Sequence, residues 1–423
     1  MSVKTNEAKH FEDFVAGGES SDIFDKAERL NSCLMGDQEL QETVETLGIQ
    51  VLRSVGHRTV LREHNGDVHE VIMLGSNSYF SLTSHPQVVA ASKAACDQYG
   101  YGMGAVSLYS GVSDFHRRLE MRIAEFHQRE DAVLFPCGYS ANVGVVSALC
   151  GPGDVVINDA FNHASIFDGC RLSGAEVKVY IHRNMKHLEK ILRQIPEKKK
   201  GRLIITDGVF SMDGDLAPLD EIVELALRYG ARVMVDDAHG LGVVGPTGRG
   251  TAERYGVMDK IDVTVGMLSK TPGAIGGYCA GSRDLVRYLR YYARTYFFST
   301  SLPAPVVAGL IEVFNLLIKD NVGRDALWRN VRALRTGLRD MGFNTGQTES
   351  AIVPVIVGDE KKLARFCNDL RRNGVYTNMV SYPAVRRKEC RLRLCVMSTL
   401  TREDLRTVLD VFHAMGRKHE LIK

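Results

Sequence analysis

The chain has 423 residues, of which 44% are hydrophobic and 25% are charged, and its formal net charge at pH 7 is +2. This composition is ordinary for a soluble globular protein, and the small net charge gives no electrostatic case for nucleic-acid binding. No run reaches the ~18 consecutive apolar residues that a transmembrane helix needs.

Nine cysteines are scattered along the chain, mostly inside apolar runs and without CxxC spacing. An odd, dispersed set is typical of reduced thiols, so we expect a cytoplasmic protein without a disulfide framework. The first residues have neither an apolar core nor a cleavage site, so we expect no signal peptide. We find no residue spacing typical of a metal site.

The N-terminal region up to about residue 56 shows helical periodicity, clearest from Gln38 to Leu52, without a strand pattern. We interpret it either as a helical arm that packs on a partner subunit or on the small domain, or as an extension that only stabilises the fold. A short strand from Val68 to Met73 then leads into a turn that contains Asn77 and Tyr79. Pro86 marks the first turn of the following helix.

A glycine-rich segment from Gly100 to Gly111 has a backbone able to approach a ligand or a second subunit closely. After it, AVLFPCGYSAN predicts a strand, a tight turn and a helix that begins near Gly138 and Tyr139. The free N–H groups of a helix start can hold a phosphate. The next strand ends at His163.

Three runs rich in β-branched residues lie between Leu203 and Gly277, with a helical pattern from Leu219 to Gly230 between the first two. They predict buried strands of a parallel sheet with crossover helices. Ligands bind beyond the carboxyl ends of such strands, so the residues there should face one crevice. These residues are Asp207, Ser211, Asp236, His239, Ser269 and Lys270.

From about Pro303 two long helical patterns, Ala304 to Lys319 and Asp325 to Met341, lead into alternating short strands and helices. This pattern predicts a small α+β domain. We therefore divide the chain into residues 1–75 (the helical arm and a small-domain segment), 76–302 (the large cofactor-binding domain) and 303–423 (the C-terminal small domain).

An acid at a strand end, a histidine three residues later and a lysine after the next strand suit the pyridine nitrogen, phenolic oxygen and aldehyde of pyridoxal 5'-phosphate (PLP). In order and spacing, TDGVFSMDGD, VDDAHG and GMLSKTPGAIGGY resemble the α-oxoamine synthases. These PLP enzymes join an amino acid to an acyl thioester with loss of carbon dioxide. The resemblance runs from about Leu74 to the C-terminus and implies an α/β fold of type I, with a mostly parallel seven-stranded sheet.

The resemblance also implies residue roles. Lys270 would carry the cofactor as a Schiff base and then act as general base, Asp236 would keep the pyridine nitrogen protonated, and His239 would bond the phenolic oxygen. The implied cofactor-binding set is Gly138, Tyr139, His163, Ser211, Asp236, His239, Ser269, Lys270, Ser299 and Thr300. His163 would stack on the pyridine ring, and either His163 or Ser211 would serve as oxyanion donor.

Asn77 and Arg393 are the implied substrate-binding residues, and Arg393 fits the carboxylate-binding position better than Arg391. Ser299 and Thr300 match a family segment that reaches the phosphate of the neighbouring subunit. We therefore expect a homodimer with shared active sites.

Several positions depart from the family pattern. Met267 stands where a threonine hydroxyl usually meets the phosphate, and Leu400 stands where a histidine is usual. Ser107, Val112 and Cys137 are also atypical. The amino acid (serine, glycine or alanine) and the acyl donor (coenzyme A or a carrier protein) therefore stay open, and a specialised pathway is plausible.

Two other functions share part of this pattern. An aminotransferase or a β-carbon lyase of the same fold would share Lys270 and Asp236, but it would not explain the other motifs. A catalytically silent partner subunit would be expected to lose the lysine, which this chain keeps.

Overall fold

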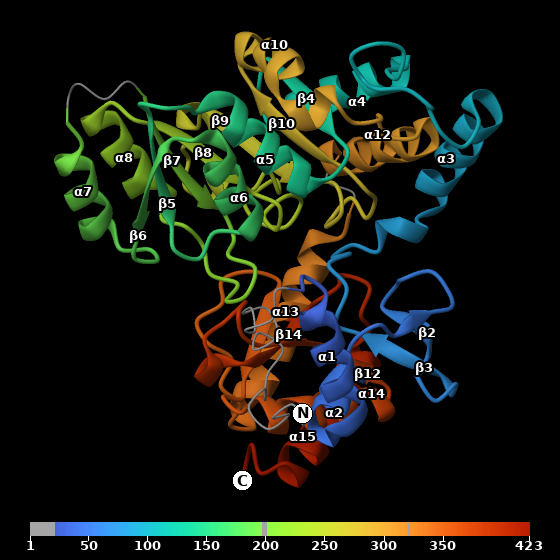
Figure 1. Ribbon diagram of the computed structural model, residues 1–423. Coiled ribbons are helices and arrows are strands. Elements are labelled where there is room, and N and C mark those ends of the chain that lie inside the picture. Colours follow the sequence, from blue (N-terminus) through green and yellow to red (C-terminus); the bar gives the residue numbers. More distant parts are fainter. Residues whose placement is uncertain (1–21, 197–200, 320–321) are drawn as a thin grey trace.

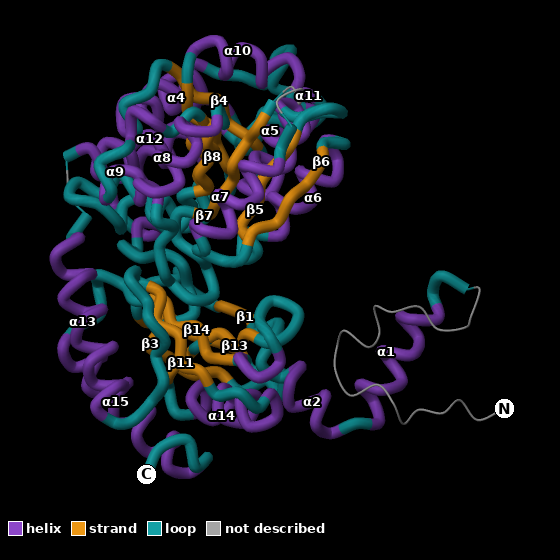
Figure 2. Tube along the Cα trace, turned by 90° about the vertical axis from the view of Figure 1, so that its left-hand side faces the viewer, coloured by secondary structure: helices purple, strands orange, loops and turns teal. Residues whose placement is uncertain are grey.

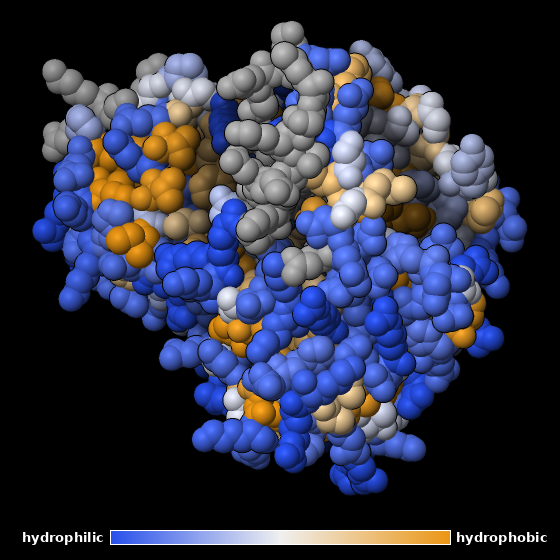
Figure 3. Space-filling view, turned by 60° about the horizontal axis from the view of Figure 1, so that its bottom comes forward, coloured by the Kyte–Doolittle hydropathy of each residue, from blue (hydrophilic) through white to orange (hydrophobic). Residues whose placement is uncertain are grey.

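The computed structural model describes residues 22–196, 201–319 and 322–423, which form a larger and a smaller body (Figure 1). The first residues of the chain, for which we expect no signal peptide, lie outside these ranges. Within them, no helix combines the length and the apolar character needed to cross a membrane. The face shown in Figure 3 is mostly hydrophilic, with separate apolar patches.

A seven-stranded sheet in the order β4-β10-β9-β8-β7-β5-β6 forms the centre of the larger body. Its strands are β4 (Asp131–Phe135), β5 (Val155–Asp159), β6 (Glu176–Tyr180), β7 (Arg202–Asp207), β8 (Arg232–Asp236), β9 (Val263–Met267) and β10 (Gly277–Gly281). Neighbouring strands in the series β6, β5, β7, β8 and β9 pair in parallel, whereas β10 is antiparallel to both β4 and β9. The predicted mostly parallel seven-stranded sheet is confirmed.

Helices cover both faces of this sheet. The helices of the larger body are α3 (Pro86–Tyr99), α4 (Asp114–Phe126), α5 (Gly138–Leu149), α6 (Ala164–Ser173), α7 (Met185–Gln194), α8 (Leu219–Tyr229), α9 (Thr251–Arg254), α10 (Arg283–Tyr292), α11 (Arg294–Phe297) and α12 (Ala304–Ile318). Alternate residues of β5 enter different cores. Val156 joins the apolar cluster that includes α5 and α6, whereas Ile157 joins the cluster that includes α7 and α8. Strands buried on both sides explain the continuous apolar runs.

The smaller body contains two sheets. One joins β1 (Gln50–Val51), β2 (Arg58–Arg62), β3 (Val68–Met73) and β12 (Val375–Tyr376), and the other joins β11 (Ile352–Ile356), β14 (Arg391–Cys395) and β13 (Asn378–Val380). Its helices are α1 (Asp25–Gly36), α2 (Gln38–Val44), α13 (Arg324–Asp340), α14 (Glu360–Arg372) and α15 (Arg402–Lys418). Because β3 pairs in parallel with β12, both ends of the chain build this body (Figure 1).

The predicted domain boundaries stay a prediction. The structure adds that α12, the first helix after residue 303, packs against α3 and α4 of the larger body.

The N-terminal segment differs from its prediction. Helix α2 ends at Val44, and Gln50 and Val51 pair with β2, so the expectation of no strand before residue 56 is wrong. The physical reason is local, because Gly48 has φ +68°, which ends the helical path. Helix α2 packs on α14, where Asn368 Nδ2 donates to the Glu42 carbonyl oxygen at 2.9 Å. The arm therefore packs on the smaller body through α2, which is one of the predicted alternatives. Helix α1 extends away from the smaller body (Figure 2).

Candidate active site

The residues at the carboxyl ends of β7 and β8 lie at the junction between the two bodies, where the sequence predicts a crevice. Arg393 on β14 reaches across this junction, and its Nε donates to the carbonyl oxygen of Ser211. The loop that follows β7 therefore connects the sheet of the larger body to the smaller body.

Asp236, the last residue of β8, is a buried carboxylate. Its Oδ2 accepts a hydrogen bond from Asn142 Nδ2 at 2.6 Å, and its Oδ1 accepts one from the backbone N–H of Ala238 at 3.1 Å. Burial raises the pKa of Asp236. Burial and the neighbouring Asp236 also raise the pKa of Asp207 well above its usual value. No cation of the described residues lies within ion-pair distance of Asp236, so a protonated ligand nitrogen would complete this environment.

His239 is buried beside Tyr79, and the Tyr79 hydroxyl lies 2.8 Å from His239 Nδ1. Burial lowers the pKa of His239 well below its usual value, and the positive charges of Lys270 and Arg393 lower it further. The imidazole is therefore neutral at physiological pH.

Lys270 lies just beyond β9 and is partly exposed. Burial lowers the pKa of its ammonium group, and the nearby Arg393 guanidinium adds to this effect. A lysine with a lowered pKa has more of the neutral amine that reacts with an aldehyde. Ser269 beside it is exposed.

The start of α5 forms another wall. Gly138 is its first residue, and a Cβ placed there would lie 2.1 Å from Met267 Sδ. Only glycine therefore lets Met267 pack against this helix start, where free N–H groups can hold a phosphate. Tyr139 is exposed, and its hydroxyl donates to Asp168 Oδ2.

His163 caps α6, and its Nδ1 lies 2.7 Å from Ser165 Oγ. Ser165 Oγ also accepts from Asn142 Nδ2 at 2.9 Å, and that nitrogen donates to Asp236 as well. A continuous polar chain thus links His163 to the acid at the end of β8.

The two arginines of β14 have different partners. Arg391 Nη1 lies 2.5 Å from Asp213 Oδ1, which neutralises its charge. Arg393 Nη1 donates to Asn77 Oδ1 at 3.0 Å, and no described carboxylate lies within ion-pair distance of Arg393. These contacts favour Arg393 as the group that binds a substrate carboxylate.

The structure brings part of the predicted set together, namely Lys270, Asp236, His239, His163, Asn77 and Arg393. Ser211 takes part through its carbonyl oxygen. Thr300 is exposed and forms a bridge with Val106, and Ser299 before it is partly exposed. These positions, together with Tyr139 and Ser269, stay predictions.

Sequence reasoning gave no role to Asn142, Ser165 and Cys395, and it noted Tyr79 without assigning one. A signal existed for Asn142, which lies four residues after Gly138 and therefore on the same face of α5. Cys395 follows Arg393 by two residues on β14, so the two side chains share one face of the strand.

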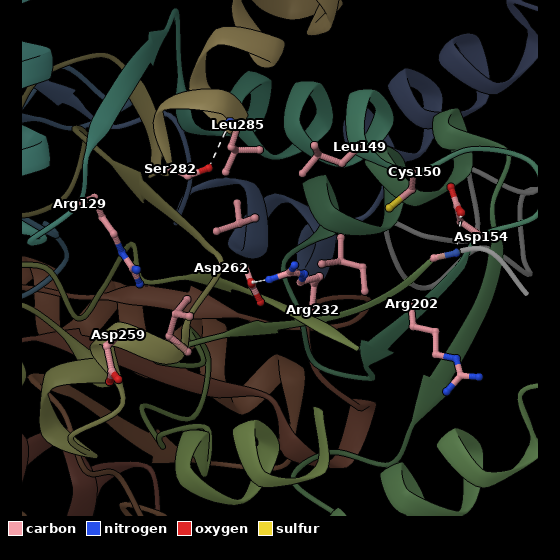
Figure 4. Close-up of a pocket in the computed structure, with 14 residues that line it drawn as sticks. Arg129, Leu149, Cys150, Asp154, Arg202, Arg232, Asp259, Asp262, Ser282 and Leu285 are labelled. Carbon is pink, nitrogen blue, oxygen red and sulfur yellow. Dashed lines mark hydrogen bonds and ion pairs between the residues drawn. The ribbon is translucent and has the colours of Figure 1, made fainter. Parts of the chain in front are cut away.

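A cavity of about 490 Å³ lies at the opposite edge of the sheet, where β7, β8 and β9 begin (Figure 4). Its guanidinium groups have partners within the protein. Arg232 pairs with Asp262 at 2.5 Å, Arg202 donates to the Tyr229 carbonyl oxygen and Arg129 donates to the Met258 carbonyl oxygen. This cavity is separate from the crevice described above.

The crevice residues fit PLP. A buried acid without a cation suits the pyridine nitrogen, a neutral histidine suits the phenolic oxygen, and a lysine of lowered pKa suits the aldehyde. The start of α5 suits the phosphate. The fold and the site together define a fold-type-I PLP enzyme.

Comparison with known proteins identifies the family. The chain belongs to the family Aminotransferase class I and II, which it matches over residues 69–412. It is 42% identical over 369 residues to 8-amino-7-oxononanoate synthase from Thermoanaerobacter pseudethanolicus, covering 86% of this chain and 93% of that protein. It is 38% identical over 406 residues to 4-hydroxy-2,2'-bipyrrole-5-methanol synthase PigH from Serratia sp., covering 96% of this chain and 62% of that protein.

A solved structure of a lysine-to-alanine variant of serine palmitoyltransferase from S. paucimobilis with a bound PLP-myriocin aldimine superposes with a TM-score of 0.89 at 34% identity, covering 95% of this chain and all of that one. Together these relatives show an α-oxoamine synthase, a PLP-dependent C-acyltransferase that condenses an amino acid with an acyl thioester. The predictions of family, fold class, cofactor and reaction class are confirmed.

Proposed function

We propose that this enzyme condenses a small L-amino acid (serine, glycine or alanine) with an acyl thioester of coenzyme A or of a carrier protein, giving an α-aminoketone and carbon dioxide. The observation that carries this proposal is the arrangement of Lys270 just beyond β9, the buried Asp236 at the end of β8, and Arg393, which bonds Asn77 and the Ser211 carbonyl oxygen. PLP, when bound, supplies a ring that stabilises negative charge at the substrate α-carbon.

Two residues tune that ring. Asp236 holds the proton at the pyridine nitrogen, because a buried carboxylate binds a cationic N–H strongly. Tyr79 donates its hydroxyl hydrogen to Nδ1 of the neutral His239, which leaves Nε2 as the N–H that donates to the phenolic oxygen.

The remaining residues bind and orient. When PLP is bound, the backbone N–H groups at Gly138 and Tyr139 would bind its phosphate, His163 would lie against its ring, and Ser211 and Ser269 would line the site. Arg393 and Asn77 would hold the substrate carboxylate and so orient the amino acid. Lys270, once neutral and free, accepts the α-proton, and His163 or Ser211 donates to the oxygen of the acyl group.

We also propose a homodimer in which Ser299 and Thr300 reach the partner's phosphate site. Exposed aromatic side chains near these residues and along the glycine-rich segment support it, because Tyr101 is 91%, Tyr109 is 77% and Phe298 is 66% exposed. Sedimentation of the holoenzyme tests this, and a monomer at working concentration would contradict it.

We also propose a cytoplasmic location, which the nine free cysteines support.

The test of function is to record the visible absorbance of the holoenzyme while serine, glycine, alanine and threonine are added singly, and then an acyl thioester. We expect one amino acid to change the spectrum, and carbon dioxide release to depend on the thioester. Carbon dioxide release without a thioester, or amino transfer to a keto acid, would favour an aminotransferase or lyase. A protein that stays colourless after reconstitution would favour a silent partner subunit.

A further inference from the structure

Cys395 is a thiol in the active site that the roles above leave unused. It is the last residue of β14 and is 0% exposed. Its Sγ lies 3.3 Å from Arg393 Nη1 and 3.3 Å from Asn77 Oδ1. A thiol can accept one hydrogen bond and donate another, so Cys395 accepts from the guanidinium and donates to the amide oxygen.

These contacts fix the orientation of the Asn77 amide. Its Oδ1 accepts from Arg393 Nη1 at 3.0 Å and from the Cys395 thiol. Rotating the amide by half a turn would place Nδ2 against the Arg393 guanidinium, which can only donate, and lose the hydrogen bond at 3.0 Å. Nδ2 donates to no described residue, and Asn77 is partly exposed, so this N–H donor is open to a ligand.

The same contacts hold the Arg393 head group. Its Nε donates to the carbonyl oxygen of Ser211, and its Nη1 is shared by Asn77 and Cys395. The planar guanidinium cannot rotate without breaking interactions on both of these nitrogens. Cys395 contacts both Arg393 and Asn77, the two residues proposed to bind the substrate carboxylate, and is itself closed to solvent.

We propose that Cys395 is a positioning residue for the amino acid substrate. Its thiol ties Asn77 and Arg393 together, so that Asn77 presents Nδ2 and Arg393 presents its remaining N–H groups to the same carboxylate. This proposal rests on the proposed carboxylate-binding role of Asn77 and Arg393. It adds that the affinity for the amino acid depends on a donor at position 395.

The experiment compares Cys395→Ala, which removes the thiol, with Cys395→Ser, which keeps a donor and an acceptor. Cys390→Ala is the matched control, because Cys390 is a buried thiol on the approach to the same strand and has no contact with the site. KM for the amino acid, KM for the acyl thioester, kcat, the Kd for PLP and the melting temperature are measured for each holoenzyme.

We expect Cys395→Ala to raise KM for the amino acid about three- to tenfold, the scale of one ordinary hydrogen bond. The kcat, the KM for the thioester and the Kd for PLP should stay within about twofold, because the lost contact acts on ground-state binding of the amino acid. Cys395→Ser should restore most of the affinity, and Cys390→Ala should leave it unchanged. An unchanged KM in Cys395→Ala, or equal changes in all the constants, would overturn the proposal.

Two further variants separate this proposal from the proposed function. If Arg393→Lys leaves the KM for the amino acid unchanged, the carboxylate-binding assignment itself is wrong. If Arg393→Lys raises it and Cys395→Ala does not, only the role of Cys395 is wrong. In an Asn77→Ala background, Cys395→Ala should have a smaller effect than in the parent, because its hydrogen bond to Asn77 is already absent and only its contact with Arg393 remains to be lost. Full additivity of the two changes would contradict the mechanism.

Discussion

The Tyr79 hydroxyl lies 2.8 Å from Nδ1 of His239, although 160 residues separate the two in the chain. Both side chains are buried, and their rings meet edge to face with centroids 6.2 Å apart. This contact joins the segment before α3 to the loop after β8, and it leaves Nε2 as the imidazole nitrogen without a hydrogen-bond partner among the described residues.

Tyr79→Phe should therefore lower kcat/KM by about tenfold, since a buried acceptor loses its donor and the imidazole can adopt the other tautomer. Steady-state kinetics on the holoenzyme measure this. Tyr278→Phe is the matched control, because the Tyr278 hydroxyl lies 2.7 Å from His127 Nε2, a buried Tyr–His pair outside the crevice. A control variant that loses as much activity as Tyr79→Phe would show that the effect comes from general destabilisation.

Lys270→Ala should lower kcat by at least about 1,000-fold and change the visible spectrum of the bound cofactor, because no other described amine is proposed to react with the aldehyde. Rapid-quench assays of product and absorbance measure the two effects. Lys260→Ala, at a surface turn before β9, is the control. Condensed product at the parent rate would remove Lys270 from its assigned role.

Met267→Thr should strengthen cofactor binding. Met267 packs on Gly138 at the start of α5, and threonine would place a hydroxyl where the phosphate is expected. A charge-assisted hydrogen bond contributes about 1 to 3 kcal/mol, so the Kd for PLP should fall by about 5- to 160-fold. Equilibrium dialysis of the apoenzyme measures it. Met267→Leu keeps the volume without a hydroxyl and should match the parent, whereas equal Kd values for the threonine variant and the parent would refute the explanation.

The stability of the protein should depend on His182. Its ring lies 2.9 Å from Asp159 Oδ1 and 3.0 Å from Asp215 Oδ2, and it stacks on Phe161. These carboxylates outweigh the effect of burial and raise the pKa of His182 from 6.5 to about 9. A raised folded-state pKa stabilises the fold fully below about pH 6.5, and this contribution is lost as the pH rises through about 9.

Denaturant titrations should therefore show the free energy of unfolding falling by about 3 kcal/mol between about pH 6.5 and 10 through this group. His182→Gln should flatten that part of the curve. His413→Gln, at an exposed position of α15, should leave it unchanged. The prediction fails if the parent and His182→Gln lose stability in parallel over this range.

The sequence predicted the sheet well because buried parallel strands are continuous apolar runs, and their carboxyl ends necessarily meet at one edge. Asp236 and Lys270 were predicted from that geometry and from the family resemblance. The strand Gln50–Val51 was missed because two residues carry no measurable periodicity, and only pairing with β2 makes them a strand.

Contacts between distant segments could not be predicted in the same way. Asn142 looks like one polar residue in an apolar helix, and its role becomes visible only where α5 meets the end of β8. Arg391 and Arg393 share a strand face and a residue type, so the sequence alone does not show which one is neutralised by Asp213. Such distinctions depend on the tertiary packing of the crevice.

The pairing of β3 with β12 has a consequence for biosynthesis. Residues 72 and 73 find their partners at Val375 and Tyr376, about 300 residues later in the chain. At translation rates of about 5 to 20 residues per second, β3 waits about 15 to 60 s for the strand that completes its sheet. The strands of the larger body are synthesised within this interval, because they lie between β3 and β12 in the chain. The larger body can therefore fold while the edge of β3 that later pairs with β12 is still unpaired.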